Sequence, residues 1–146
     1  HAQPGDRCSA FGDYPVTDYF RWVAAVGRAQ HPRVALPEAM RRVSSHDFTE
    51  FAESRLGNVM LAFTGTAQST LGKSGAFYAQ VLKGPRVESE ETPTGVTIRY
   101  REYAGPVEFY PIGTIEGTCK HYRSDYSIEV SVLSPRDADY VVRLPR

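Results

Sequence analysis

The chain has 146 residues, of which 41% are hydrophobic, 12% aromatic and 23% charged. This length fits one domain that can bury a core of its own. Seventeen basic and seventeen acidic residues give a net charge of zero. That balance gives no support for a nucleic-acid-binding protein, and no apolar run approaches the roughly 18 residues of a membrane span.

The first third of the sequence has the spacing of amphipathic helices. Pro15 suits the first turn of a helix, and His31-Pro32 ends it, because proline cannot continue a helix. Pro37 opens a second helix, and Ser44 and Asp47, which have capping-box spacing, predict a break after it. The apolar faces of these helices carry Val16, Tyr19, Phe20, Val23 and Gly27, then Met40 and Val43.

Three shorter helical pieces follow. Gly57 is expected to interrupt the chain between the first two, and a bend is expected in the third near Gly72 or Gly75. The pieces cover residues 48–52, 58–63 and 71–81.

After Gly84-Pro85, apolar side chains alternate with polar ones, as in half-buried strands. Strands are predicted over residues 86–90, 95–100, 126–132 and 140–144, with a helix over 106–122. Turns at 91–94 and 134–139 join the strands into two hairpins.

The sequence therefore predicts an α+β fold: an N-terminal helical bundle packed on one face of a four-stranded antiparallel sheet, in the order helices, hairpin, helix, hairpin. We expect a single domain over residues 1–146, with a helical part at about 13–82 and a hairpin–helix–hairpin part at about 86–145. Cys8 and Cys119 are interpreted as two reduced thiols, and the polar start indicates no signal peptide. These features favour a cytoplasmic protein.

Five segments resemble an uncharacterised domain family with many myxobacterial paralogues, and the resemblance spans nearly the whole chain. They are Asp13-Tyr14-Pro15, Ala39 to Arg42, Phe48 to Ser54, Gly113-x-x-Glu116-Gly117 and Ser134 to Tyr140. More distantly, residues 95–144 resemble the C-terminal half of haem–nitric-oxide-binding (H-NOX) domains, with a similar element order in 4-vinyl-reductase-like and TRAPP-type folds. This resemblance implies a cavity between helices and sheet that holds haem, a small hydrophobic molecule or an acyl chain.

Haem is not favoured by the residues themselves. A haem sensor of this superfamily needs an axial histidine on the helix before the sheet, and residues 71–81 contain none; Tyr78 is the one oxygen ligand there. Tyr100-Arg101-Glu102-Tyr103-Ala104 keeps only the tyrosine of the H-NOX propionate clamp. No metal site is predicted either, because Cys119 and His121 point to different sides of a helix.

No catalytic constellation is predicted. Gly72-Lys73-Ser74-Gly75 lacks the first glycine and the preceding strand of a phosphate loop. The acidic pairs Asp47/Glu50 and Glu88/Glu90 are interpreted as solvated surface charges.

Most aromatic side chains are expected in the core, and a few of them on a ligand pocket. Gly113 and Gly117, one turn apart, predict either close packing of their helix or a bare strip of backbone that leaves room for a ligand. Glu116 between them needs a partner if it faces inward, with Arg99 and Arg101 as candidates. The candidate ligand-binding residues are Phe63, Phe77, Tyr78, Phe109, Gly113 and Gly117.

Trp22 lies off the apolar stripe of its helix and predicts an exposed contact surface, for a protein partner, a second copy or a further N-terminal segment. Together these features favour a non-catalytic ligand-binding or protein-interaction module with a sensory or scaffolding role and no cofactor. It would hold a small hydrophobic molecule between helices and sheet. A haem-based gas sensor and an enzyme acting on a small hydrophobic substrate are the alternatives.

Overall fold

The computed structural model describes residues 15–145, in which six helices precede or interrupt four strands. The helices are α1 (Val16–Gln30), α2 (Leu36–Glu53), α3 (Arg55–Leu61), α4 (Ala67–Gly72), α5 (Ser74–Val81) and α6 (Tyr110–His121). The strands are β1 (Arg86–Thr92), β2 (Gly95–Arg101), β3 (Ser127–Ser134) and β4 (Asp137–Arg143). No helix in this part of the chain is both long and apolar enough to cross a membrane.

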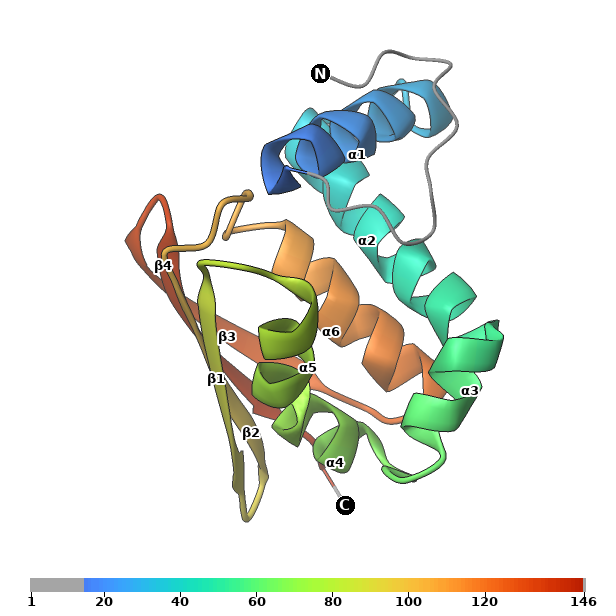
Figure 1. Ribbon diagram of the computed structural model, residues 1–146, viewed down its shortest axis with the longest axis vertical. Helices are drawn as coiled ribbons and strands as arrows, with labels where there is room; N and C mark the ends of the chain where they lie inside the picture. Colours follow the sequence, from blue (N-terminus) through green and yellow to red (C-terminus); the bar gives the residue numbers. More distant parts are fainter. Residues whose placement is uncertain (1–14, 146) are drawn as a thin grey trace.

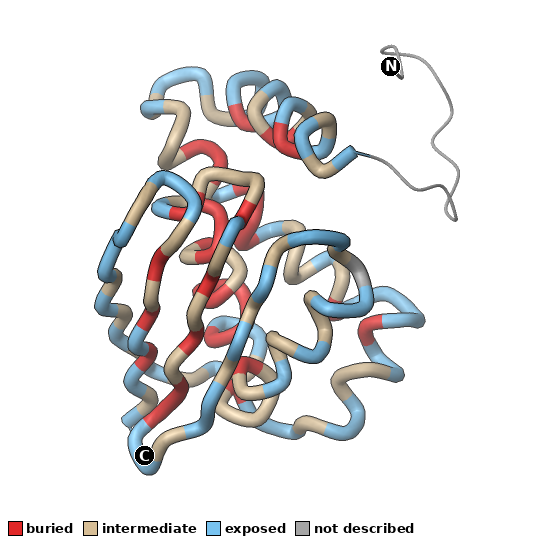
Figure 2. The backbone as a smooth tube through the Cα atoms, turned by 60° about the vertical axis from the view of Figure 1, so that its left-hand side comes forward, coloured by how far each residue is buried: buried red, intermediate tan, exposed pale blue. Residues whose placement is uncertain are grey.

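The four strands form one antiparallel sheet in the order β1-β2-β4-β3. The two hairpins therefore meet along β2 and β4, where Ile98 lies opposite Tyr140. Buried and less buried residues alternate along both central strands, as Figure 2 shows, because successive side chains point to opposite faces. The inner face carries the core side chains Val96, Ile98, Tyr100, Ala138, Tyr140 and Val142.

The helices cover that face in two tiers (Figure 1). α4 and α5 pack on β1 and β2, and α6 lies between the sheet and α2. α1 packs on α2 at the end farther from α4. Ile115 and Cys119 of α6 join the sheet residues in one hydrophobic cluster. The predicted fold class, helices on one face of a four-stranded antiparallel sheet, is confirmed.

Several predicted boundaries are wrong. Residues 44–47 do not break the chain: α2 continues to Glu53, because Ser44 and Ser45 are buried against α6 and Ser44 Oγ donates to the carbonyl of Tyr110 at 2.7 Å. Gly57 lies inside α3, where a side chain would meet the backbone of Phe51; Ser54 caps that helix instead.

Two other boundaries shift along the chain. α6 begins at Tyr110 rather than at 106, and the last turn is confined to Pro135 and Arg136, since β4 already begins at Asp137. The predicted bend is confirmed, because α4 ends at Gly72 and α5 begins at Ser74.

Candidate functional site

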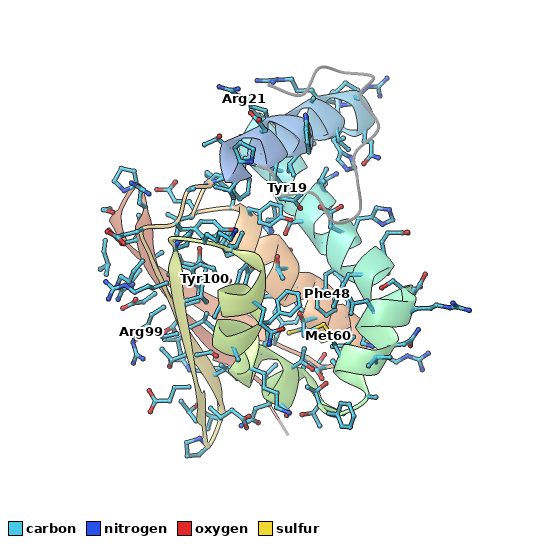
Figure 3. All side chains as sticks on the ribbon, viewed as in Figure 1. Tyr19, Arg21, Phe48, Met60, Arg99 and Tyr100 are labelled. Atoms are coloured by element: carbon cyan, nitrogen blue, oxygen red, sulfur yellow. The ribbon has the colours of Figure 1, made fainter. Side chains whose placement is uncertain are left out.

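A cavity of about 880 Å³ lies between the helices and the inner face of the sheet. In Figure 3, Tyr19, Phe48, Met60 and Tyr100 lie around this space, whereas Arg21 and Arg99 point away from it. All six helices and β2 contribute to its wall. Its central lining residues are Tyr19, Phe20, Ser44, Asp47, Phe48, Phe51, Met60, Leu61, Thr70, Leu71, Phe77, Tyr78, Ile98, Tyr100, Tyr103, Tyr110, Thr114, Ile115 and Thr118.

Aromatic rings form a continuous part of this wall. Phe51 of α2 contacts Phe77 of α5 at a centroid distance of 5.5 Å, and Phe77 contacts Tyr78 at 6.1 Å. Tyr78 in turn meets Tyr100 of β2 at 5.7 Å. The two contacts of Tyr78 are edge-to-face and that of Phe51 with Phe77 is tilted; together they fix the rings of three elements relative to one another.

The hydroxyl of Tyr78 lies among other hydroxyls of the cavity wall. Burial raises the pKa of Tyr78, while hydrogen bonds with Tyr100, Thr114 and Tyr103 act in the opposite direction. Burial also raises the pKa of Tyr100 and of Tyr103 well above the usual range. These phenols are therefore neutral hydrogen-bonding groups at physiological pH.

A second polar group lies where α1, α2 and α6 meet. Tyr19 Oη donates to Asp47 Oδ2 at 3.2 Å, Tyr110 Oη lies 3.4 Å from the same oxygen, and the two hydroxyls bond to each other. Burial raises the pKa of Asp47 above its ordinary value and raises that of Tyr19 to about 12. The interpretation of Asp47 as a solvated surface charge is wrong, because it lines the cavity and is half-buried.

A third hydroxyl cluster closes the side near α3 and α4. Thr64 Oγ1 and Thr70 Oγ1 both lie 2.9 Å from Tyr122 Oη and 2.8 Å from each other. The three hydroxyls are hydrogen-bonded to one another, and these bonds hold the α3–α4 connection to the end of α6.

The structure brings together only part of the predicted ligand site. Phe77 and Tyr78 line the cavity. Phe63 is 80% exposed and lies outside the cavity, and Phe109, in the turn before α6, is not on its wall. Helical periodicity cannot show which aromatic residues line the cavity when, like Phe63 and Phe109, they lie just beyond a helix end and belong to no helical face.

Gly113 and Gly117 do not face the cavity. A β-carbon at either position would meet the backbone of α2, 2.1 Å from the carbonyl oxygen of Arg41 and 2.7 Å from that of Ser45. Of the two explanations for this pair, close helix packing therefore holds. The ligand-binding interpretation is wrong.

Glu116, on the same helix, also faces α2. Arg41 Nε donates to its carboxylate at 2.9 Å, and the Arg41 guanidinium makes a second bond to it. The partner expected on the hairpin is not there, because Arg99 pairs with Glu90 and Arg101 with Asp139.

The remaining predicted residues lie elsewhere. Trp22 is half-buried on α1 rather than exposed, and it is not on the cavity wall. Cys119 is a fully buried free thiol, while Cys8 lies outside the described residues. Among residues 15–145, no three histidine, cysteine or acidic side chains lie close enough together to hold a metal ion.

The sequence model of a family described as "Protein of unknown function (DUF2378)" matches residues 3–143. None of the curated proteins matches the chain. The resemblance to H-NOX domains is matched by solved structures, whose low sequence identity makes it a likeness of fold.

Three of these structures show how far the likeness extends. An H-NOX protein from S. oneidensis in the Fe(II)NO ligation state is 17% identical, with a TM-score of 0.74 over 98% of this chain and 83% of that one. The Fe(II) unliganded H-NOX protein from K. algicida is 14% identical, with a TM-score of 0.74 over 94% of this chain and 77% of that one. A mutant of the H-NOX protein from T. tengcongensis is 17% identical, with a TM-score of 0.72 over 99% of this chain and 82% of that one.

The residues on the cavity wall do not fit a haem iron. α4 and α5, which precede the sheet, contain no histidine, and the described histidines at 31, 46 and 121 do not line the cavity. The hydroxyl of Tyr78, the oxygen best placed on those helices, is hydrogen-bonded, and burial raises its pKa, which disfavours the phenolate that iron would bind.

Proposed function

The chain belongs to the DUF2378 family of proteins of unknown function, and we propose that it is a non-catalytic ligand-binding module that holds a small hydrophobic molecule between its helices and its sheet. The observation that carries this proposal is the cavity of about 880 Å³. Ligand pockets commonly measure about 300–1,000 Å³ and combine an apolar wall with a few polar groups. The aromatic wall with its three hydroxyl clusters has this character.

The same wall supports a binding role over a catalytic one. Within the described residues, no histidine or cysteine side chain lines the cavity, so its serines and threonines lack an imidazole base. Most of its hydroxyls bond to each other or to backbone carbonyls, which orients them as fixed polar contacts.

Native mass spectrometry of the full chain tests the proposal directly. We expect a retained small molecule that is released on unfolding. Met60→Trp should abolish retention, because Met60 lines the cavity from α3 and the larger indole would fill it. Val59→Trp is the matched control, since Val59 is 63% exposed on the same helix. Empty protein, or equal retention by both variants, would contradict the proposal.

A haem-based gas sensor is the alternative that the H-NOX-like fold raises. Because none of the described histidines lies on the cavity wall to bind the haem iron, we expect no Soret band from a bound haem after haem is added to the purified protein. A Soret band that Tyr78→Phe removes would establish the alternative instead.

An enzyme acting on a small hydrophobic substrate is the other alternative, and Asp47 is the observation that favours it, since a half-buried carboxylate with a raised pKa suits a general acid or base. Mass analysis of the ligand after long incubation separates the two roles. An unchanged ligand supports binding alone, whereas a product that Asp47→Asn abolishes supports catalysis.

We further propose a sensory or scaffolding role, in which binding of the ligand in the cavity changes how the protein associates with a protein partner or a second copy. α2 supports this, because it carries Asp47 and Phe48 on the cavity wall and also packs on α1, the helix of Trp22. Light scattering of ligand-loaded and ligand-free protein tests it, and Trp22→Ala should reduce any association. A monomer in both states would contradict a homodimer.

A further inference from the structure

The cavity has one acidic end. Among residues 15–145, Asp47 is the only carboxylate on the cavity wall, and it sits between the hydroxyls of Tyr19 and Tyr110. Tyr110 also contacts Phe20 edge-to-face at 5.2 Å, and Phe48 follows Asp47 on α2. The carboxylate is thus surrounded by aromatic side chains at one end of an apolar cavity.

Counting protons shows what this end can bind. The two phenols have two hydroxyl protons: one forms the bond between the two hydroxyls, and the other is donated to Asp47 Oδ2 by Tyr19 or Tyr110. Among the described residues, the hydrogen bonds to this carboxylate come from Tyr19 and Tyr110 and reach Oδ2, and none reaches Oδ1. With an ionised carboxylate, this end therefore accepts hydrogen bonds and has no proton left to donate.

We propose that Asp47, Tyr19 and Tyr110 bind the ammonium head of an organic amine whose apolar part occupies the aromatic part of the cavity. This inference rests on the proposed function. An ammonium supplies three donors and a positive charge to the carboxylate. The neighbouring aromatic rings add cation–π attraction, which a neutral or anionic head cannot gain.

The positive charges on the wall do not favour an anionic head. Lys73 Nζ is exposed and donates to the carbonyl of Phe63 at 3.2 Å, at the α3–α4 corner. The charged groups that act most on Asp47 are His46 and Glu50, which form an exposed pair on α2, and not Lys73 or Lys83. The negative charge of an ionised Asp47 would repel an anionic head at this end of the cavity.

Calorimetric titration with three probes of equal chain length tests this choice: octylamine, 1-octanol and octanoate at pH 7.5. We expect octylamine to bind most tightly and octanoate most weakly. Asp47→Asn should weaken octylamine binding about tenfold, since a hydrogen bond to a charged group is lost, and octanol binding much less. Tyr19→Phe, which leaves Asp47 in place, should weaken octylamine binding by a smaller factor.

Glu50→Gln is the matched control, because it removes the same charge one helical turn away on the exposed face of α2, and it should change the octylamine affinity much less than Asp47→Asn does. Equal affinity of the three probes, or no effect of Asp47→Asn, overturns the amine assignment while the cavity remains a binding site. Binding of none of the probes, together with an empty protein in native mass spectrometry, overturns the proposed function itself.

Discussion

Gly113 of α6 and Arg41 of α2 lie so close that a β-carbon on the glycine would fall 2.1 Å from the arginine carbonyl oxygen. Gly117, one turn later, stands in the same relation to Ser45, at 2.7 Å. Two glycines in a helix cost about 2 kcal/mol in helix propensity. The close packing of the two backbones offsets that cost, and it places the cavity-lining face of α2 next to that of α6.

Gly113→Ala should therefore destabilise the fold. The added methyl group has no room against backbone atoms, so α6 must move away from α2, at a cost of about 3 kcal/mol. Urea unfolding followed by circular dichroism measures the change. Gly27→Ala is the control, because the atom nearest its new β-carbon would be Ala39 Cβ at 3.2 Å, with backbone atoms no nearer than 3.4 Å, and helix propensity improves. Equal stability of the two variants would show that the helix pair tolerates separation.

The ion pair between Arg41 and Glu116 should contribute to stability because one partner is nearly buried. The Glu116 side chain is 11% exposed and that of Arg41 39%. Arg41→Met leaves the carboxylate without its partner, and we expect a loss of about 2 kcal/mol, less than for a fully buried pair because Arg41 is partly solvated.

The exposed pair of Arg143 and Glu129 provides the comparison for this effect. Arg143→Met should change the thermal midpoint little, because water screens that pair. A double-mutant cycle with Glu116→Gln isolates the coupling between Arg41 and Glu116, and a coupling near zero would contradict the assigned role.

Asp47 should make the protein less stable as the pH rises. Burial raises its folded-state pKa above the ordinary value of 3.8, so between these two values the native state binds more protons than the unfolded state. Stability is lost across that window, and the penalty is fully present above it. Asp47→Asn should therefore match the wild type near pH 3 and exceed its thermal midpoint at pH 7.5. A wild type that gains on the variant with rising pH would show that the tyrosine hydrogen bonds outweigh burial.

Cys119 should be unreactive in the folded protein. It is fully buried, and burial together with the negative charge of Glu116 raises its pKa to about 11. In a Cys8→Ser background, the aromatic disulfide reagent DTNB at pH 8 should react slowly with folded protein and rapidly in urea. Similar rates in both conditions would mean that α6 opens readily.

The secondary structure was predictable where one pattern acted alone. Alternation along residues 95–100 and 126–132 predicted β2 and β3 because one face of β2 is buried and one face of β3 is partly buried over most of its length. The predicted break at residues 44–47 is wrong. The spacing of Ser44 and Asp47 suits a helix cap, but a tertiary contact with α6 keeps these residues inside α2. Ser44 and Ser45 bury their polar atoms against α6, which the sequence pattern of one helix cannot reveal.

The candidate site was less predictable than the fold. Phe77 and Tyr78 follow from an apolar helical face, but the acidic end of the cavity depends on three helices meeting in space. One signal was available: Asp47 falls four residues after Val43 and four before Phe51, on the inward face of a continuous helix. Only the assumption of a break concealed it.

The strand order β1-β2-β4-β3 has a consequence for synthesis on the ribosome. β4, one of the two central strands, is the last of the four described strands to be translated. Until residues 137–143 emerge, β2 therefore exposes an unpaired edge, although the first hairpin and the five helices before it have already been made. A chain that stops within this strand would lack the second hairpin, and β2 would keep an unpaired edge that can pair with another chain.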